Sequence, residues 1–225
     1  MRNPFPATAL LIALLCAGCG GGDSDETGAT TGQAEGRVAS GSVTISGDDR
    51  EAGSLTWTRP EVGELDEEQV EQAQEQAGEA LDEGRLYDDG DSAIPLYLAL
   101  LDRDADDGSA REGLEKARRR LLEMGDDALS DAGEDFVALR EARRVAAVAR
   151  TVWPDDEEVA AYLQRVDLAD QLWELNRQAE DEIAAGRLGE SGGGAIALLR
   201  QALELSPGQA RAMQNLAAVE SALIR

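Results

Sequence analysis

The chain has 225 residues and a formal net charge of −25, because 46 acidic side chains outnumber 21 basic ones. This charge argues against a nucleic-acid partner, since such binding needs a basic face. Histidine is absent and no cysteine follows Cys19, so the sequence lacks the usual acid–base residue near neutral pH and, beyond that point, any thiol for catalysis or metal binding.

The N-terminus has the features of a secretory signal. Arg2 is the only charged residue before Asp23, and residues 9–15 form an apolar run that is too short to span a bilayer. A basic start, a short apolar stretch and small residues after it are typical of a signal peptide. We therefore predict that residues 1–18 are a signal peptide and do not belong to the fold.

The end of this segment reads L-C-A-G-C over residues 15–19. It resembles the lipobox of bacterial lipoproteins, in which small residues precede a cysteine that is lipidated and becomes the mature N-terminus. Ala17 and Gly18 fit the positions before Cys19, although Cys16 replaces the usual leucine. The resemblance implies a lipid anchor at Cys19, and Gly20 after it implies the outer membrane, facing the periplasm. The alternative is an ordinary signal peptide with two incidental cysteines.

Residues 19–60 are rich in Gly, Ser, Thr and Asp and hold few large apolar side chains. Such a segment cannot bury enough apolar surface to offset its ordering entropy, so we predict a flexible linker. Within it, residues 42–46 and 54–58 alternate polar and apolar side chains, which predicts a small β-hairpin over residues 42–58. An isolated hairpin is marginal in water, so it would dock on the helices or remain mobile, with Trp57 as its anchor.

A glycine-led stretch recurs three times in the remainder, which we interpret as one helical domain over residues 61–225. It reads G-R-L-Y-D-D-G-D-S-A-I-P-L from Gly84 and G-R-L-G-E-S-G-G-G-A-I-A-L from Gly186, with a weaker copy from Gly133. The three glycines lie 49 and 53 residues apart, and an alanine follows each by nine positions, at Ala93, Ala142 and Ala195. A near-fixed period indicates a repeat architecture.

Strong helix formers fill this domain, and apolar residues recur at three- and four-residue steps. We predict helices over residues 66–83, 93–101, 109–132, 138–151, 157–185, 195–205 and 209–225. Gly84 is expected to end the first helix in the left-handed conformation, Gly125 to kink or divide the third, and Pro154 to interrupt the fourth. The fifth helix carries two apolar stripes, which suits a helix sandwiched between two neighbouring repeats.

The pattern A-I-x-L-L-x-x-A-L-E-L-S-P over residues 195–207 resembles the second helix of a tetratricopeptide repeat. Ala142 and Pro154 match its spacing in the second copy, whereas Ala105 replaces the proline in the first. The period of about 50 exceeds the 34 residues of that family because the turns and helices are longer. The resemblance implies an all-α fold of three tetratricopeptide-like copies, with Ala142 and Ala195 at close helix–helix contacts.

A wider resemblance rests on L-T-W at residues 55–57, G-R-L-Y at 84–87 and A-I-P-L-Y at 93–97. These stretches are similar to the N-terminal helical region of exported bacterial proteins that carry a C-terminal domain of the formylglycine-generating-enzyme family. The sequence contains no such domain, so no catalytic residue is carried over. The resemblance leaves the alternative that the chain is the non-catalytic front of a larger modifying enzyme.

Two clusters of charged residues are candidate sites. Asp102, Asp104, Asp106 and Asp107 partly match a calcium loop, but Gly108 falls one position late and Gly113 replaces the closing glutamate; we favour an ordinary inter-helix turn. Arginines gather at residues 118–120, 140, 143 and 144, with acids at helical spacing at residues 115, 123, 134 and 141. Ion pairs within the fold are favoured over an anion site.

The sequence therefore predicts no catalytic residues, no cofactor and no metal. The expected function is a lipid-anchored scaffold for a protein or peptide partner, since stacked helix pairs form extended concave surfaces. The acidic surface suits solubility, or else attracts cationic peptides or divalent cations. We expect Val219, Leu223 and Ile224 to be uncovered in the last helix, which would allow association through it.

Overall fold

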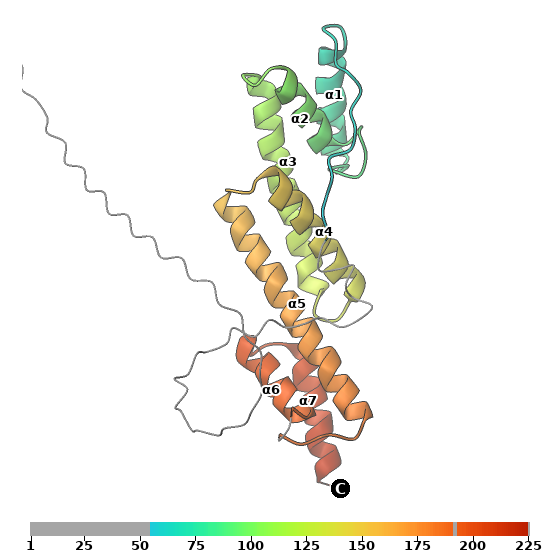
Figure 1. The fold of residues 1–225 in the computed structure, drawn as a ribbon, viewed down its shortest axis with the longest axis vertical. Helices are drawn as coiled ribbons and strands as arrows, with labels where there is room; N and C mark the ends of the chain where they lie inside the picture. Colours follow the sequence, from blue (N-terminus) through green and yellow to red (C-terminus); the bar gives the residue numbers. More distant parts are fainter. Residues whose placement is uncertain (1–54, 191–192, 225) are drawn as a thin grey trace, which may run out of the picture. The chain divides into compact units, whose positions relative to one another are not determined.

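A computed structural model describes residues 55–190 and 193–224, all of which belong to a single compact unit (Figure 1). These residues form seven helices and no strand, which confirms the predicted all-α fold. The helices are α1 (Gln69–Asp82), α2 (Ala93–Arg103), α3 (Gly108–Asp131), α4 (Phe136–Val152), α5 (Glu157–Ala184), α6 (Ala195–Leu205) and α7 (Ala210–Leu223). Residues 55–58 of the predicted hairpin are not in a strand, and residues 42–54 lie outside the described part.

Side-chain caps decide where several helices begin. Asp66 accepts hydrogen bonds from the backbone N–H groups of Glu68 and Gln69, and the Gln69 side chain accepts one from the Asp66 N–H. This reciprocal arrangement is a capping box with Asp66 at the cap position, and the regular helix begins at Gln69 rather than at the predicted residue 66. Asp135 caps α4 by accepting from the Val137 N–H, and the helix starts two residues earlier than predicted.

The helices pack in a regular order. Each helix packs against the next one along the chain, and α1–α3, α3–α5 and α5–α7 also pack against each other. The even-numbered helices α2, α4 and α6 do not pack against one another. The odd-numbered helices therefore form one continuous layer, and the even-numbered helices lie on it separately.

Helix α3 runs unbroken through Gly125, so the predicted kink or division at this residue is wrong. The glycine serves packing instead, because a Cβ there would lie 2.4 Å from the hydroxyl oxygen of Tyr162. That buried hydroxyl donates a hydrogen bond of 2.8 Å to the Ala142 carbonyl oxygen. Burial raises the pKa of Tyr162 above its ordinary value, so the phenol stays protonated and keeps this donor. Gly113 makes room for the ring of Tyr97 in the same way.

Two hydrophobic clusters form the core, and α5 belongs to both. Its N-terminal half contributes Val159, Tyr162 and Val166 to the cluster formed with α1 to α4. Its C-terminal half contributes Leu172, Leu175 and Ala179 to the cluster formed with α6 and α7. The predicted position of α5 between two neighbours is thus present, with its N-terminal half in one cluster and its C-terminal half in the other.

Residues 55–65, which we call the strap, lie against α2 and the loop before it. Trp57 donates from its indole nitrogen to the Tyr87 carbonyl oxygen at 3.1 Å, and Arg59 donates to the Pro95 carbonyl oxygen and pairs with Asp102 at 2.6 Å. Arg103 donates to the Leu65 carbonyl oxygen. Trp57, Val62 and Leu65 also pack against the first cluster, so the strap helps to bury the very apolar α2.

The loops at residues 84–92 and 186–194 have the same backbone hydrogen bonds. Gly84 and Gly186 have φ values of 76° and 73°, and each ends the preceding helix with a left-handed residue. The N–H groups of Ala93 and Ala195 then donate to the carbonyl oxygens of Arg85 and Arg187, each at 3.0 Å. The weaker copy differs, since Gly133 is not left-handed and the short turn after α3 leads directly into α4.

The predicted close contacts and the predicted uncovered end have different outcomes. Ala142 and Ala195 are both completely buried, as expected. Leu223 and Ile224 are 56% and 86% exposed, which confirms that they lack cover. The expectation for Val219 is wrong, because this residue is only 2% exposed and packs with α5 and α6.

Candidate functional site

Three hollows adjoin along the layer of odd-numbered helices. The first, of about 340 Å³, lies between α3 and α5, and it shares Asp126 and Arg165 with a second of about 410 Å³. The second shares Leu129, Ser130, Ala169 and Leu172 with a third of about 570 Å³, which reaches the start of α7. Together they form one continuous groove over α3, α5 and α7, which we call the groove.

The lining of the groove includes a series of apolar side chains from α3 and α5. These are Leu122, Leu129, Ala161, Leu168, Ala169 and Leu172. Leu168 is 36% exposed although it lies in α5, the long helix that contributes side chains to both hydrophobic clusters. Apolar side chains that line a hollow without being buried indicate a surface suited to an apolar ligand group.

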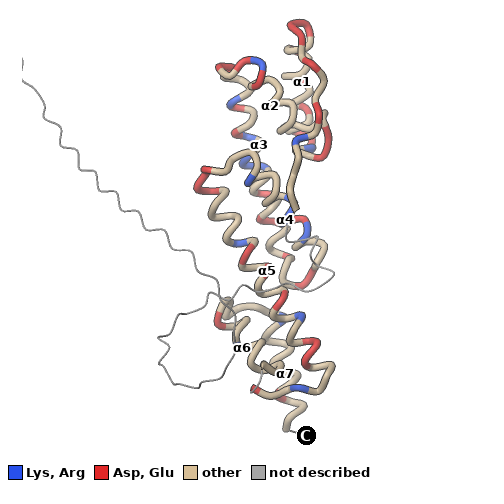
Figure 2. The backbone as a smooth tube through the Cα atoms, in the orientation of Figure 1, with Lys and Arg blue, Asp and Glu red and all other residues tan. Residues whose placement is uncertain are grey.

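Charged side chains line the groove beside this apolar strip, and acids predominate. Six acids line it: Glu123, Asp126, Asp131, Glu134, Asp135 and Glu158. Three arginines do so: Arg119, Arg165 and Arg211. Asp126 pairs with Arg165 at 2.5 Å and Glu158 pairs with Arg118 at 2.7 Å. Figure 2 shows acidic and basic residues interspersed along α3 and α5.

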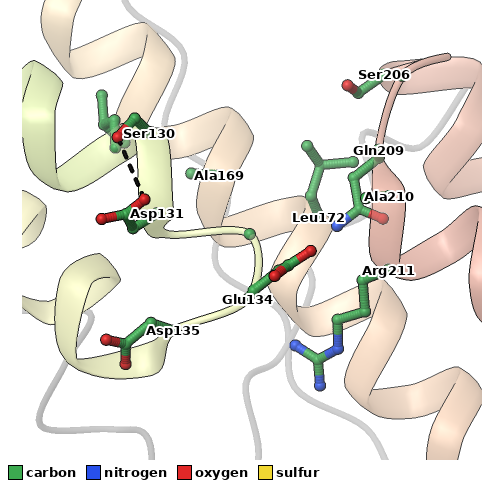
Figure 3. Close-up of a pocket in the computed structure, with 13 residues that line it drawn as sticks. Ser130, Asp131, Glu134, Asp135, Ala169, Leu172, Ser206, Gln209, Ala210 and Arg211 are labelled. Atoms are coloured by element: carbon green, nitrogen blue, oxygen red, sulfur yellow. Dashed lines mark hydrogen bonds between the residues drawn. The ribbon is translucent and has the colours of Figure 1, made fainter.

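The largest hollow lies between two turns, as Figure 3 shows. One wall is the α3–α4 turn, and the other is the α6–α7 turn with Gln209 and Arg211. Asp131 accepts a weak hydrogen bond of 3.4 Å from Ser130, and Asp135 caps α4. The side chain of Glu134 projects into the space between the walls and has no hydrogen-bond or ion-pair partner among the described residues, although its backbone N–H donates to the Asp131 carbonyl oxygen. Its carboxylate is therefore available to a ligand.

Arg211 fixes the opposite wall to α5. Its guanidinium donates two hydrogen bonds of 2.8 Å to Glu180 and lies 4.3 Å from the centre of the Trp173 ring. The hydrogen bond from Arg211 lowers the pKa of Glu180, which also accepts a hydrogen bond from Asn215 at 3.0 Å. The third guanidinium nitrogen of Arg211 is buried without a partner. This wall is consequently held by charge-assisted bonds and a cation–π contact.

A stack of side chains joins this wall to α4. The rings of Phe136 and Trp173 lie 5.3 Å apart, with Arg143 over Phe136 at 5.7 Å and Arg211 over Trp173. Arg143 also pairs with Asp170 of α5 at 2.7 Å. Burial raises the pKa of Asp170 despite this arginine. The stack connects α4, α5 and α7, so it supports both walls of the largest of the three hollows.

The residues of the candidate calcium loop are engaged within the fold. Asp102 pairs with Arg59, Asp104 accepts from the Asp106 N–H, and Asp106 pairs with Arg111 at 2.7 Å. Asp107 caps α3 by accepting from Ser109 and Ala110. These hydrogen bonds, above all the one from Ala110, lower the pKa of Asp107. The geometry is that of the inter-helix turn favoured from the sequence, and no metal-holding group of three or more such side chains occurs in residues 55–190 and 193–224.

The arginine clusters form ion pairs, as the sequence predicted. Arg118 pairs with Glu115 at 3.1 Å, Arg120 with Glu123 at 3.4 Å and Arg144 with Glu141 at 3.3 Å. Arg118 also reaches Asp156 across the α4–α5 turn, and Arg143 reaches Asp170, which the sequence spacing did not indicate. The lipidation candidate Cys19 lies outside the described residues. None of the helices in the described part is long and apolar enough to cross a membrane.

The sequence did not reveal the groove. Its acids and leucines belong to helices that are 40 or so residues apart along the chain, and only the packing of α3 on α5 brings them together. The chain matches no family model, no curated protein and no solved structure.

Proposed function

We propose that this protein is an exported lipoprotein whose helical domain binds a peptide segment of a partner protein in the groove. The single observation that supports peptide binding is the continuity of the groove over three helices, with charged side chains beside an apolar strip. The proposed export and lipid anchor rest on the N-terminal sequence. A groove of this form suits a chain segment better than a compact metabolite, because it is long and shallow and carries repeated apolar contacts.

The helix pairs α1–α2, α3–α4 and α5–α6 are interpreted as three tetratricopeptide-like copies, followed by α7. The contacts between successive odd-numbered helices support this interpretation, as do the matched hydrogen bonds after Gly84 and Gly186. In such a stack the layer of odd-numbered helices offers an extended surface to a partner.

The charges of the groove favour a cationic ligand. Six acids and three arginines line it, and the side chain of Glu134 has no partner in the described chain. The whole protein carries a net charge of −25. A peptide that alternates apolar and basic side chains could contact the leucines of the groove with its apolar residues and the acidic side chains with its basic residues. Electrostatic attraction between exposed charges is screened by salt, so the affinity should fall as ionic strength rises.

The lipid anchor is tested by labelling cells with radioactive palmitate while they produce the full chain or its Cys19→Ala variant. The expected result is label on the wild type and none on the variant, because the proposed lipid is attached through the thiol of Cys19. Equal labelling of the two proteins would refute the anchor. The proposed position, on the outer membrane and facing the periplasm, is then tested by membrane fractionation and by protection from external protease.

The groove is tested with two labelled dodecapeptides, one of alternating leucine and arginine and one of alternating leucine and glutamate. The full chain in detergent should bind the cationic peptide, with an affinity that falls as salt is added, and should not bind the acidic one. Leu168→Glu should weaken cationic binding by about tenfold or more, because it removes an apolar contact although it adds an attractive charge.

The matched control is Val137→Glu, which makes the same substitution at a residue that is 61% exposed and does not line the groove. Binding by this variant should equal that of the wild type. If Leu168→Glu and Val137→Glu bind equally well, attraction is merely by net charge and the groove is not the site. Failure of the wild type to prefer the cationic peptide would also refute the proposal.

A further inference from the structure

The helices α2 and α6 can be compared residue by residue, because the same local sequence and hydrogen bonds introduce both. G-R-L at residues 84–86 and A-I at 93–94 recur as G-R-L at 186–188 and A-I at 195–196. In each unit the residue two after the glycine accepts a hydrogen bond from the N–H of the isoleucine, at 3.0 Å and 3.4 Å. Every residue of one unit therefore has a counterpart 102 positions away.

The counterparts differ in burial. Leu86, Pro95 and Leu96 are buried in the first unit, at 2% exposure for Leu86 and 3% for Leu96. Their counterparts Leu188, Ala197 and Leu198 are only partly buried. At the end of the helix, Leu205 of α6 is 42% exposed and takes the place of Arg103, which is exposed too but polar. The face of α6 that corresponds to the covered face of α2 is thus apolar and open.

The strap is part of what covers the first unit. Arg59 binds the Pro95 carbonyl oxygen and Asp102, and the Leu65 carbonyl oxygen accepts from Arg103, so the strap follows α2 from its first turn to its last. No segment of the described chain takes the same position on α6. The strap on α2 shows which chemistry fits such a face: apolar side chains on either side of an arginine.

The charges of α6 agree with this. Glu204 is the counterpart of Asp102, which Arg59 pairs with, and Glu204 is exposed and has no ion pair within the described residues. Arg200 stands where α2 has Leu98, but it pairs with Glu190 of the preceding loop, which compensates its charge. Figure 2 shows that α6 and α7 carry few charges, and on α6 itself a ligand meets mainly apolar surface and the one uncompensated acid Glu204.

We infer that the face of α6 formed by Ala197, Leu198, Glu204 and Leu205 binds an extended segment of another polypeptide, one with apolar side chains flanking an arginine as in the strap. The groove lies on the layer of odd-numbered helices and this face lies on an even-numbered one, so the inference does not depend on the proposed function. A positive result at one surface and a negative result at the other would be a consistent outcome.

The test uses a dye-labelled synthetic peptide with the sequence of residues 54–66 and the full chain in detergent. Fluorescence anisotropy should show saturable binding, because the native strap already occupies α2 whereas the corresponding face of α6 is open in the described part of the chain. Glu204→Arg should weaken this binding by about tenfold, since it replaces an attraction with a repulsion. The same peptide with Arg59→Glu should bind the Glu204→Arg protein better than the wild-type peptide does. Leu205→Asp should weaken binding of either peptide.

The control is Glu220→Arg, which makes the same charge reversal on α7 at a residue that is also exposed and unpaired in the described chain. It should bind the wild-type peptide with unchanged affinity. The inference is overturned if the wild-type chain does not bind, if Glu204→Arg and Glu220→Arg weaken binding equally, or if the reversed peptide gains nothing on the Glu204→Arg protein. An unchanged affinity of the Glu204→Arg variant would mean exchange with the strap on α2, which also overturns it.

Discussion

The units at residues 84–103 and 186–205 begin with the same three residues and the same backbone hydrogen bonds, but their helices are packed differently. The first begins with a left-handed glycine and is covered by the strap. Its apolar side chains belong to a large cluster that also includes side chains of α1, α3, α4 and α5. The second has the same glycine conformation and the same buried alanine, but its helix keeps an open apolar face.

The difference separates two levels of structure. Local sequence determines how the chain leaves one helix and enters the next, because this depends on a φ angle and a few backbone bonds. Burial of the resulting helix depends on which segments pack over it, and these include residues 30 positions away, such as Trp57 for the first unit. Three sets of substitutions can break or sharpen this distinction.

The largest effect is expected for the strap. Trp57→Ala removes a half-buried indole that packs on the core and donates to the Tyr87 carbonyl oxygen. The free energy of unfolding should fall by about 2–3 kcal/mol, toward the low end for large aromatic truncations because Trp57 is not fully buried. Chemical denaturation of the full chain in detergent measures the change. The matched control is Leu205→Ala on α6, where the open face predicts a change under about 0.5 kcal/mol. Equal losses would show that the face of α6 is already covered.

A smaller effect is expected for the alanines that enter the two helices. Ala93 and Ala195 are both fully buried, so a leucine at either position would overpack the contact and cost about 1–3 kcal/mol. Thermal melting of Ala93→Leu and Ala195→Leu should show losses of similar size. Ala217→Leu, at an exposed position of α7, serves as the control and should leave the melting temperature unchanged. A loss at one alanine only would break the equivalence of the two units.

The smallest effect is expected for the two left-handed glycines. An added Cβ at Gly84 or Gly186 would meet no atom within 4 Å, so Gly84→Ala and Gly186→Ala change only backbone strain. Each should lower the free energy of unfolding by about 1 kcal/mol, the strain of a left-handed alanine less the gain from a stiffer unfolded chain. Gly133→Ala is the control, since that glycine is not left-handed and a Cβ there would make an ordinary contact of 3.7 Å with Gln209. If Gly133→Ala lowered the free energy of unfolding as much as the other two substitutions, the left-handed φ angle would not be the cause of the loss.

Much of the fold could be predicted from the sequence because it is local. The ends of α6 follow from Ala195 and the Ser206-Pro207-Gly208 turn, and the structure places this helix at the predicted residues. The three-residue error at the start of α1 arises because Asp66 caps the helix from outside it. Gly125 misled the prediction, since a glycine inside a helix can relieve crowding by a partner, here Tyr162, that lies 37 positions away and is invisible to periodicity.

The candidate site was out of reach of the same reasoning. Glu134 was expected to pair with an arginine at helical spacing, but it lies in the turn before α4 and projects into the largest hollow instead. Leu168 lies between the parts of α5 that enter the two cores, and it therefore lines the groove. One signal was available in the sequence: the polar residues Asp167, Asp170 and Gln171 interrupt the apolar pattern of α5 near Leu168.

The sharing of α5 between two cores has a consequence for how the molecule loses its structure. The α6–α7 cluster is much the smaller of the two and depends on the C-terminal half of α5 for its base. In a linear array, stability is the sum of each unit and its contacts with the next, so the end unit opens first. Amide protons of α6 and α7 should therefore exchange through partial openings that leave α1 to α4 intact. Such an opening must break the contact between the guanidinium of Arg211 in α7 and the ring of Trp173 in α5.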